Sequence, residues 1–208
     1  MLDSTIDISY WNKELRNKTP QEIISWALSL TDKKIVTTSF GVYSAVLLST
    51  ISKQAQDIKV VWCDTLFNTP ETYSHANNLI NTFNLNVEKY EPLLSKSVID
   101  ATIGIPEVTS PKHAEFTEVV KLEPFRRALA EQSPELWFTN IRVRQTEYRK
   151  SKDILSWSKD DVLKVSPFYY WSDEDLDAYI AEQNLPKNQF YFDPTKALQN
   201  RECGIHFQ

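Results

Sequence analysis

Apolar positions along the chain follow two alternating periods, one typical of buried β-strands and one typical of amphipathic helices. Short apolar or β-branched runs predict strands at 34–40, 58–65, 86–90, 136–142 and 161–168. Apolar residues three and four positions apart predict helices at 19–30, 43–51, 71–83, 123–132 and 172–183. Residues 92–120 carry neither period, so we expect them to be irregular.

Three of the predicted helices carry start signals. Thr19 before Pro20 suits an N-cap followed by the first helical residue, and Pro124 suits the first turn of its helix. Ser172 and Asp175 form a variant of the capping box.

The alternation of strands and helices favours an α/β fold, a doubly wound and mostly parallel sheet with helices on both faces. The 208 residues, 41% of them hydrophobic, suffice for one sizeable core. We therefore expect a single domain over residues 1–208, with a core over about 20–190 and a C-terminal tail over about 191–208. Ligands of such sheets bind beyond the carboxyl ends of the strands.

Composition and charge narrow the choice of partners. A net charge of -5 argues against a protein that coats nucleic acid, although a local basic pocket is compatible with it. No signal segment or membrane-spanning apolar run is evident, so we expect a cytoplasmic protein with no membrane partner. Two cysteines, Cys63 and Cys203, form neither a disulfide framework nor a structural zinc site.

The first polar segment at a predicted strand end is TTSFGVYSAVLL, residues 37–48. Gly41 allows a tight turn after Ser39, and the following helix, with Ser44 in its first turn, presents backbone N–H groups to an anion. The pattern predicts a phosphate site, but an ordinary strand-to-helix turn would show the same residues.

Two further segments follow predicted strands. WCDTLFNTPETY (62–73) contains Asp64 and Thr65, which could bind a ribose or a phosphate or simply cap a helix. NIRVRQTEYRK (140–150) contains Arg142, Gln145 and Arg149. The planar fork of arginine suits phosphate and sulfate oxygens, although a charged cluster is more often a solvated face.

The chain ends with RECGIH (201–206), which puts one of two cysteines beside one of three glycines. Cys203 on a tail suits a nucleophile that meets a bound substrate and then a second protein, with Gly204 as a joint. An incidental terminal thiol is the alternative interpretation.

Together these segments resemble the phosphoadenylyl sulfate (PAPS) reductase family, from about residue 20 to residue 208. SFGVYSAVLL is similar to the family's modified PP-loop, and CDTLFNTPETY to its L-D-T-G-x-x-F-P-E-T-Y segment. The third match is KLEPFRRAL, which resembles the family's helix start K-V-E-P-x-x-R-A-L. The fourth is IRVRQTEYR, which resembles its arginine segment, and the fifth is RECGIH, which resembles its catalytic tail. Each motif alone is weak, but five in the family's order are a strong signal.

The resemblance implies a PP-loop, or adenine nucleotide α-hydrolase-like, fold with a mobile C-terminal catalytic tail. It implies thiol-dependent reduction of PAPS to sulfite and adenosine 3′,5′-bisphosphate through an S-sulfocysteine on Cys203, with His206 as a second catalytic residue. This reaction belongs to sulfate assimilation and cysteine biosynthesis. The implied substrate-binding residues are Ser39, Phe40, Gly41, Ser44, Asp64, Thr65, Lys121, Arg142, Gln145, Arg149 and Arg201.

The resemblance also implies the partners. The electron donor would be thioredoxin or glutaredoxin, the assembly a homodimer, and no cofactor or iron–sulfur cluster would be bound. Four departures from the family pattern accompany these matches. Tyr43 replaces a polar residue of the PP-loop, and Asn68 interrupts the second segment just before Thr69. Asn200 replaces a basic residue, and the stretch between the helix at 172–183 and Cys203 is short.

Three alternatives stay open. They are a reductase that accepts adenylyl sulfate (APS), a PP-loop ATP pyrophosphatase or adenylyltransferase, and a nucleotide-binding relative with impaired catalysis. Phe40 and Tyr43 stand at the diagnostic positions of the ATP pyrophosphatase motif S-G-G-x-D-S and argue against that alternative.

We predict that the purified protein is colourless and free of iron. Cluster-bearing APS reductases of this family supply four cysteines, whereas this chain has two and carries Phe116 and Thr117 in place of the first pair. Iron analysis and a visible absorption spectrum measure this directly. Stoichiometric iron with a sulfur-to-iron charge-transfer band would contradict the prediction.

Overall fold

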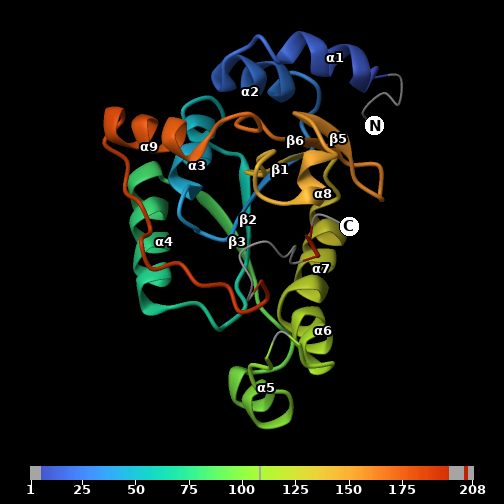
Figure 1. The fold of residues 1–208 in the computed structure, drawn as a ribbon, viewed down its shortest axis with the longest axis vertical. Helices are drawn as coiled ribbons and strands as arrows, with labels where there is room; N and C mark the ends of the chain where they lie inside the picture. The colour runs from blue at the N-terminus through green and yellow to red at the C-terminus, as the bar shows by residue number, and fades with distance from the viewer. Residues whose placement is uncertain (1–5, 108, 197–203, 206–208) are drawn as a thin grey trace.

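The structure is a computed structural model that describes residues 6–107, 109–196, 204 and 205. Its centre is a six-stranded sheet in the order β3-β2-β1-β4-β6-β5 (Figure 1). Neighbouring strands are parallel except β5 and β6, which are antiparallel. The mostly parallel α/β sheet is thereby confirmed. The strands are β1 (Lys34–Thr38), β2 (Lys59–Cys63), β3 (Asn86–Tyr90), β4 (Leu136–Phe138), β5 (Leu155–Trp157) and β6 (Leu163–Val165).

Helices cover both faces of the sheet and its lower edge in the view of Figure 1. They are α1 (Ile8–Leu15), α2 (Pro20–Leu28), α3 (Ser44–Ser52), α4 (Pro70–Phe83), α5 (Lys96–Thr102), α6 (Lys112–Thr117), the π-helix η1 (Glu118–Leu122), α7 (Glu123–Gln132), α8 (Glu147–Lys150) and α9 (Asp173–Glu182). The start signals at Thr19 and Ser172 are confirmed, because each residue completes a capping box. No helix in the described part of the chain is long and apolar enough to cross a membrane.

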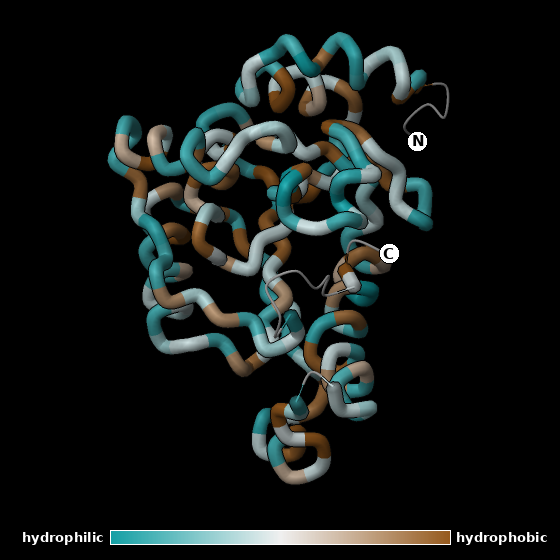
Figure 2. The backbone as a smooth tube through the Cα atoms, in the orientation of Figure 1, coloured by the Kyte–Doolittle hydropathy of each residue, from teal (hydrophilic) through white to brown (hydrophobic). Residues whose placement is uncertain are grey.

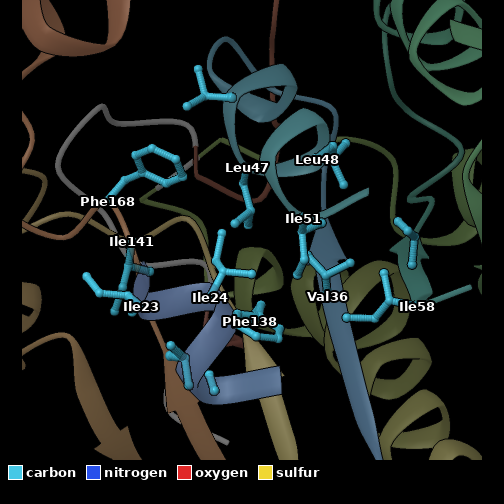
Figure 3. Close-up of a cluster of buried hydrophobic side chains, with 14 of the residues drawn as sticks. Ile23, Ile24, Val36, Leu47, Leu48, Ile51, Ile58, Phe138, Ile141 and Phe168 are labelled. Atoms are coloured by element: carbon cyan, nitrogen blue, oxygen red, sulfur yellow. The ribbon is translucent and has the colours of Figure 1, made fainter. Parts of the chain in front are cut away.

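The larger core fills the face of the sheet that α2, α3, α4 and α9 cover. Hydrophobic stretches of the backbone gather where these helices meet the strands (Figure 2). Figure 3 shows the centre of this core, formed by Ile23, Ile24, Val36, Leu47, Leu48, Ile51 and Phe138. On the opposite face α7 packs Phe125 against Trp137, with ring centroids 4.9 Å apart. Burial on both faces explains why the central strands are almost continuously apolar.

A smaller lobe lies below the sheet in Figure 1, where the sequence predicted irregular structure. Residues 92–120 contain α5 and α6, so that expectation was wrong for these segments. Phe67, Ile99, Phe116 and Val120 form the lobe's own buried cluster. The two helices have seven and six residues, too few for a helical period to emerge from the sequence.

The antiparallel edge strand β5 and the polar helix α1 were also missed. Asn12 of α1 donates from Nδ2 to the carbonyl oxygen of Leu155 (3.1 Å), and its Oδ1 accepts the Leu155 N–H (2.8 Å). The side chain thus satisfies both backbone groups of one edge residue. A strand of three residues that depends on such a contact leaves little signal in the sequence.

The strand order reverses between β1 and β4. From β1 the chain moves outward through β2 to β3, then returns beneath the other face through α7 and adds β4 on the opposite side of β1. In an open α/β sheet such a reversal creates a crevice beyond the carboxyl ends of the two strands. Ser39 follows β1 and Asn140 follows β4, so two of the three predicted binding segments, 37–48 and 140–150, reach this crevice.

We predict that Ile24→Ala lowers the free energy of unfolding by roughly 2–5 kcal/mol, because it leaves a cavity in the larger core. The Ile24 side chain is fully buried between α2 and the sheet. Leu93→Ala is the matched control, since Leu93 is 76% exposed, and its cost should stay within about 0.5 kcal/mol. Urea unfolding measures both, and equal losses would contradict the assigned packing.

Candidate functional site

A cavity of about 470 Å³ opens beyond the carboxyl ends of β1 and β4. Its described lining includes four basic side chains, Lys121, Arg142, Arg149 and Lys196, and one acidic side chain, Asp173. The chain as a whole has a net charge of -5, so this concentration of positive charge is local. Converging basic groups in a concave, partly apolar pocket suit a ligand with several anionic groups.

The loop between β1 and α3 forms one wall of the cavity. Phe40 adopts a positive φ of 49° and turns its buried ring toward Trp62, with ring centroids 4.9 Å apart. This turn leaves Ser39 and Gly41 at the cavity. No side chain among the described residues caps the N-terminus of α3, although the Ser44 N–H donates to the carbonyl oxygen of Gly41 (3.0 Å) and the Val46 N–H to that of Tyr43 (3.3 Å). The positive end of the helix dipole lies at the cavity and favours an anion there.

Two polar side chains brace this loop. Ser44 donates to the carbonyl oxygen of Gly41 (2.8 Å) and lies 3.4 Å from Nε2 of His75, whose pKa is lowered by burial. Asn140 donates from Nδ2 to the carbonyl oxygen of Tyr43 (3.0 Å). The buried Oδ1 of Asn140 has no hydrogen-bond partner within the described structure. Since Asn140 lines the cavity, it leaves an acceptor unsatisfied beside the binding space.

The segment after β4 brings two arginines to the opposite wall. Oε1 of Gln145 accepts hydrogen bonds from the backbone N–H of Arg142 (2.9 Å) and from the guanidinium of Arg149. Both arginines are more than nine-tenths buried, and both line the cavity. Arg144 is exposed and lies outside the lining. The spacing of Arg142, Gln145 and Arg149 therefore places three coupled side chains on one wall.

The Arg142 guanidinium is held on two sides. Its carbon lies 4.8 Å from the centre of the Tyr43 ring, and its Nη2 lies 2.5 Å from the Asp173 carboxylate at the start of α9. Burial lowers the pKa of Arg142 from its usual value, and the charge of Asp173 partly offsets that effect. The guanidinium keeps its proton at neutral pH, because arginine side chains are not deprotonated in proteins.

Lys121 enters the cavity from the π-helix η1, a type of helix turn that often marks functional sites. Its ammonium forms an ion pair with Asp193 and donates to Oγ1 of Thr195 (3.1 Å). Burial raises the pKa of the Asp193 carboxyl, but the charges of Lys121 and Lys196 outweigh burial and hold that pKa well below its usual range. Asp193 is therefore ionised at neutral pH.

Three residues predicted to bind substrate lie outside the cavity lining. The Phe40 ring belongs to the larger core. Asp64 uses Oδ1 to accept from the Leu66 N–H (3.0 Å), the Asn68 amide (2.9 Å) and the Tyr73 hydroxyl (2.8 Å). Thr65 accepts the Phe67 N–H (3.2 Å). The side chains of Asp64 and Thr65 organise the loop after β2, and the Phe40 side chain packs in the core.

Arg201, Cys203 and His206 lie outside the described residues. Gly204 and Ile205 are described, and Ile205 lines the cavity. Gly204 has a φ of 87°, and a Cβ added there would lie 3.1 Å from Leu122. The second cysteine, Cys63, is buried at the end of β2, as expected, and also contributes to the lining. No group of three or more potential metal ligands occurs in the described part of the chain.

Sequence reasoning missed the segment that closes the cavity after α9. Tyr191, Asp193 and Thr195 contact predicted site residues from positions more than 70 residues away. A local signal was present: Asp193 Oδ1 accepts the Thr195 N–H (3.0 Å), a turn that Asp followed two residues later by Thr favours. The sequence could predict this turn but not its long-range contacts.

Comparisons with known proteins agree with the geometry. The model of the phosphoadenosine phosphosulfate reductase domain family matches residues 33–198. A phosphoadenosine 5′-phosphosulfate reductase of Xylella fastidiosa is 30% identical over 96% of this chain and 94% of its own. The corresponding protein of Vibrio vulnificus is 34% identical over 88% of this chain and 71% of its own.

Solved structures share the fold. A PAPS reductase of Candida auris, in a phosphate complex, aligns with a TM-score of 0.77 and 24% identity over 89% of this chain and 90% of its own. An FMN adenylyltransferase of Candida glabrata aligns with a TM-score of 0.61 and 9% identity over 86% of this chain and 59% of its own. The structural matches establish the PP-loop type of fold.

We predict that Arg142→Ala and Arg149→Ala each weaken binding of adenosine 3′,5′-bisphosphate about tenfold to a hundredfold. A hydrogen bond to a charged group contributes roughly 1.5–3 kcal/mol, and both guanidinium groups line the cavity. Arg144→Ala is the control, since this exposed arginine lies two residues from Arg142 and outside the lining. Isothermal titration calorimetry measures all three, and a largest loss for Arg144→Ala would show that this wall is assigned wrongly.

Proposed function

The chain belongs to the phosphoadenosine phosphosulfate reductase family, and from that premise we propose that it reduces PAPS to sulfite and adenosine 3′,5′-bisphosphate. The observation that carries the proposal is the basic cavity at the β1/β4 crevice, with Ile205 in its wall two residues after Cys203. A binding space for a polyanionic nucleotide thus adjoins the segment that carries the nucleophile. As an oxidoreductase of this family the protein acts in sulfate assimilation.

In the proposed site the cavity holds the nucleotide through its anionic groups. Ser39, Gly41 and the N-terminus of α3 would bind one phosphate, where the helix dipole favours negative charge. Arg142 and Arg149 would bind another through their planar forks, and Lys121 would supply a point charge. Phosphate in the related Candida auris complex supports an anion site in this fold.

The first chemical step is an attack of the Cys203 thiolate on the sulfonate sulfur of PAPS. A sulfur–sulfur bond forms while the bond between sulfur and the phosphate oxygen breaks. Adenosine 3′,5′-bisphosphate leaves with that electron pair, and the basic cavity stabilises the charge that develops on it. The enzyme is left with an S-sulfocysteine. We assign His206 and Arg201 supporting roles at this thiol.

The second step needs a dithiol protein, thioredoxin or glutaredoxin. Its thiolate attacks Sγ of Cys203, sulfite leaves with the electron pair of the sulfur–sulfur bond, and the second donor thiol resolves the mixed disulfide. The donor is oxidised to a disulfide while sulfate sulfur is reduced to sulfite sulfur.

We further propose that residues 1–208 form one catalytic domain and that the protein is a homodimer. We also propose a cytoplasmic location and no bound cofactor.

We predict that Cys203 alone carries the SO₃ unit. Enzyme mixed with PAPS in the absence of reductant should gain one SO₃ on the C-terminal peptide, and reduced thioredoxin should release it as sulfite. Cys203→Ser should bind nucleotide but neither gain the adduct nor turn over. Mass spectrometry and a sulfite assay measure these outcomes.

Cys63→Ser is the matched control, because Cys63 also contributes to the cavity lining. This variant should form the adduct and release sulfite, with some loss of stability from its buried position on β2. An adduct on Cys63, or sulfite release by Cys203→Ser, would overturn the mechanism. A wild-type protein that binds PAPS without releasing sulfite would instead identify a non-catalytic relative.

A further inference from the structure

Residues 188–195, here called the strap, belong to the segment after α9 that descends past α4 in the view of Figure 1, and the strap reaches the cavity at Tyr191. Inward and outward positions alternate along part of it. Asp193 and Thr195 are buried, whereas Phe190 and Phe192 are 66% and 50% exposed. At these four positions the buried side chains are polar and the exposed ones are apolar, the reverse of an ordinary surface strand. The strap is therefore built around polar contacts beneath it.

Hydrogen bonds fix the first half of the strap to the loop after β1 and to the start of α4. Nδ2 of Asn188 donates to the carbonyl oxygen of Phe40 (3.1 Å) and lies 3.2 Å from Oγ1 of Thr72. The Thr69 hydroxyl donates to the carbonyl oxygen of Phe190 (3.3 Å). These contacts join the strap to two elements that border the crevice.

Asp193 is the centre of the second half. Its carboxylate accepts from the Thr195 N–H (3.0 Å) and hydroxyl (2.6 Å), and it pairs with the Lys121 ammonium. The Tyr191 hydroxyl lies 3.3 Å from Asp193 Oδ2 and 2.9 Å from Ser39 Oγ. One carboxylate thus connects Lys121 of η1 with Ser39 of the loop after β1, two groups that line the cavity from opposite halves of the sequence.

The burial of the Lys121–Asp193 pair indicates whether the strap stays in place when the nucleotide binds. Both side chains of the Lys121–Asp193 pair are only 5% exposed. Removing one partner from a buried pair leaves an uncompensated charge. The free-energy cost of that charge exceeds what one additional contact between Lys121 and a substrate anion contributes. The pair should therefore persist when nucleotide binds, and the strap acts as part of the cavity wall.

We propose that Asp193 is a positioning residue, which holds the Lys121 ammonium and, through Tyr191, the Ser39 hydroxyl at a fixed spacing for the anionic groups of the substrate. The inference rests on the proposed function, because it takes Lys121 and Ser39 as substrate contacts. It adds to that function a residue that acts without touching the substrate. Asp193 lies outside the cavity lining and reaches the ligand only through its partners.

A double-mutant cycle tests the proposal, with adenosine 3′,5′-bisphosphate as the probe in calorimetry. We expect D193N and K121Q each to raise the dissociation constant about tenfold, and the double variant to raise it no further than either one alone. Losses that multiply to about a hundredfold would show that Asp193 does not act through Lys121. D193E, which keeps the charge, should recover part of the affinity, and a failure to do so would also overturn the proposal.

The direction of the change in probe affinity distinguishes a positioning role of Asp193 from competition with the substrate for Lys121. If D193N bound the probe more tightly than the wild type, Asp193 would be a competitor of the substrate for Lys121, and the proposal would be wrong. D153N is the matched control, because Asp153 likewise pairs with a basic residue, Arg16, and accepts from a tyrosine hydroxyl, that of Tyr170 (2.8 Å). Asp153 lies outside the cavity lining, so D153N should leave probe affinity unchanged.

A milder variant covers the case in which D193N does not fold. Y191F removes only the hydroxyl that joins Ser39 to Asp193. It should weaken probe binding about threefold in the wild-type background and have no effect in the S39A background. An equal loss in both backgrounds would mean that Tyr191 does not act through Ser39, and the proposed network would be refuted.

A labelling experiment keeps this inference separate from the proposed reaction. Acetylation by an N-hydroxysuccinimide ester, followed by mass spectrometry of the Lys121 peptide, reports how firmly the ammonium is held without any substrate. Lys121 should react at least tenfold faster in D193N than in the wild type, while the exposed Lys33 should react equally in both. Unchanged labelling would overturn the role of Asp193, whereas a wild type that releases no sulfite would overturn only the proposed function.

Discussion

The position of β1 between β2 and β4 is the constraint on which the rest of the structure depends. Because β1 is paired in parallel on both sides, its carboxyl end and that of β4 open at the same edge of the sheet. The connections leave these strands in different directions and create the crevice. The loop after β1 therefore faces the arginine segment after β4, although about 100 residues separate them in the sequence. Each wall contributes what the other lacks: the uncapped N-terminus of α3 on one side and buried guanidinium groups on the other.

Positive charge is concentrated at the crevice. The protein is acidic overall, yet four basic side chains line one cavity. Each of three has a described partner that holds it in place: Asp193 for Lys121, Asp173 for Arg142 and Gln145 for Arg149. Fixed partners reduce the loss of side-chain freedom on binding, which favours recognition of an anion with a defined spacing of charges. The site is thus organised before a ligand arrives.

The C-terminal region completes the site in two separate pieces. The strap contacts the loop after β1 and Lys121, while Gly204 lies beside Leu122 and Ile205 lines the same cavity. The short stretch between α9 and the RECGIH motif therefore still contributes Tyr191 and Lys196 to the cavity lining. The strap supplies inward polar contacts along its length. The strap can keep the cavity walls rigid while Cys203, the proposed nucleophile, reacts first with the nucleotide and then with the protein donor.

Local patterns in the sequence were enough for the central strands, the longer helices and the capping boxes at Thr19 and Ser172, because propensity and periodicity act over a few residues. They also brought Ser39, Gly41, Ser44, Arg142, Gln145 and Arg149 to attention, since chemistry at strand ends follows from the fold class. Only the tertiary structure decided that Phe40, Asp64 and Thr65 lie outside the lining, and that Asn12 protects β5. It also decided that Asp193 pairs with Lys121 across 72 positions of the sequence. Such contacts depend on how distant segments pack, and a buried charge finds its partner only after the chain has folded around it.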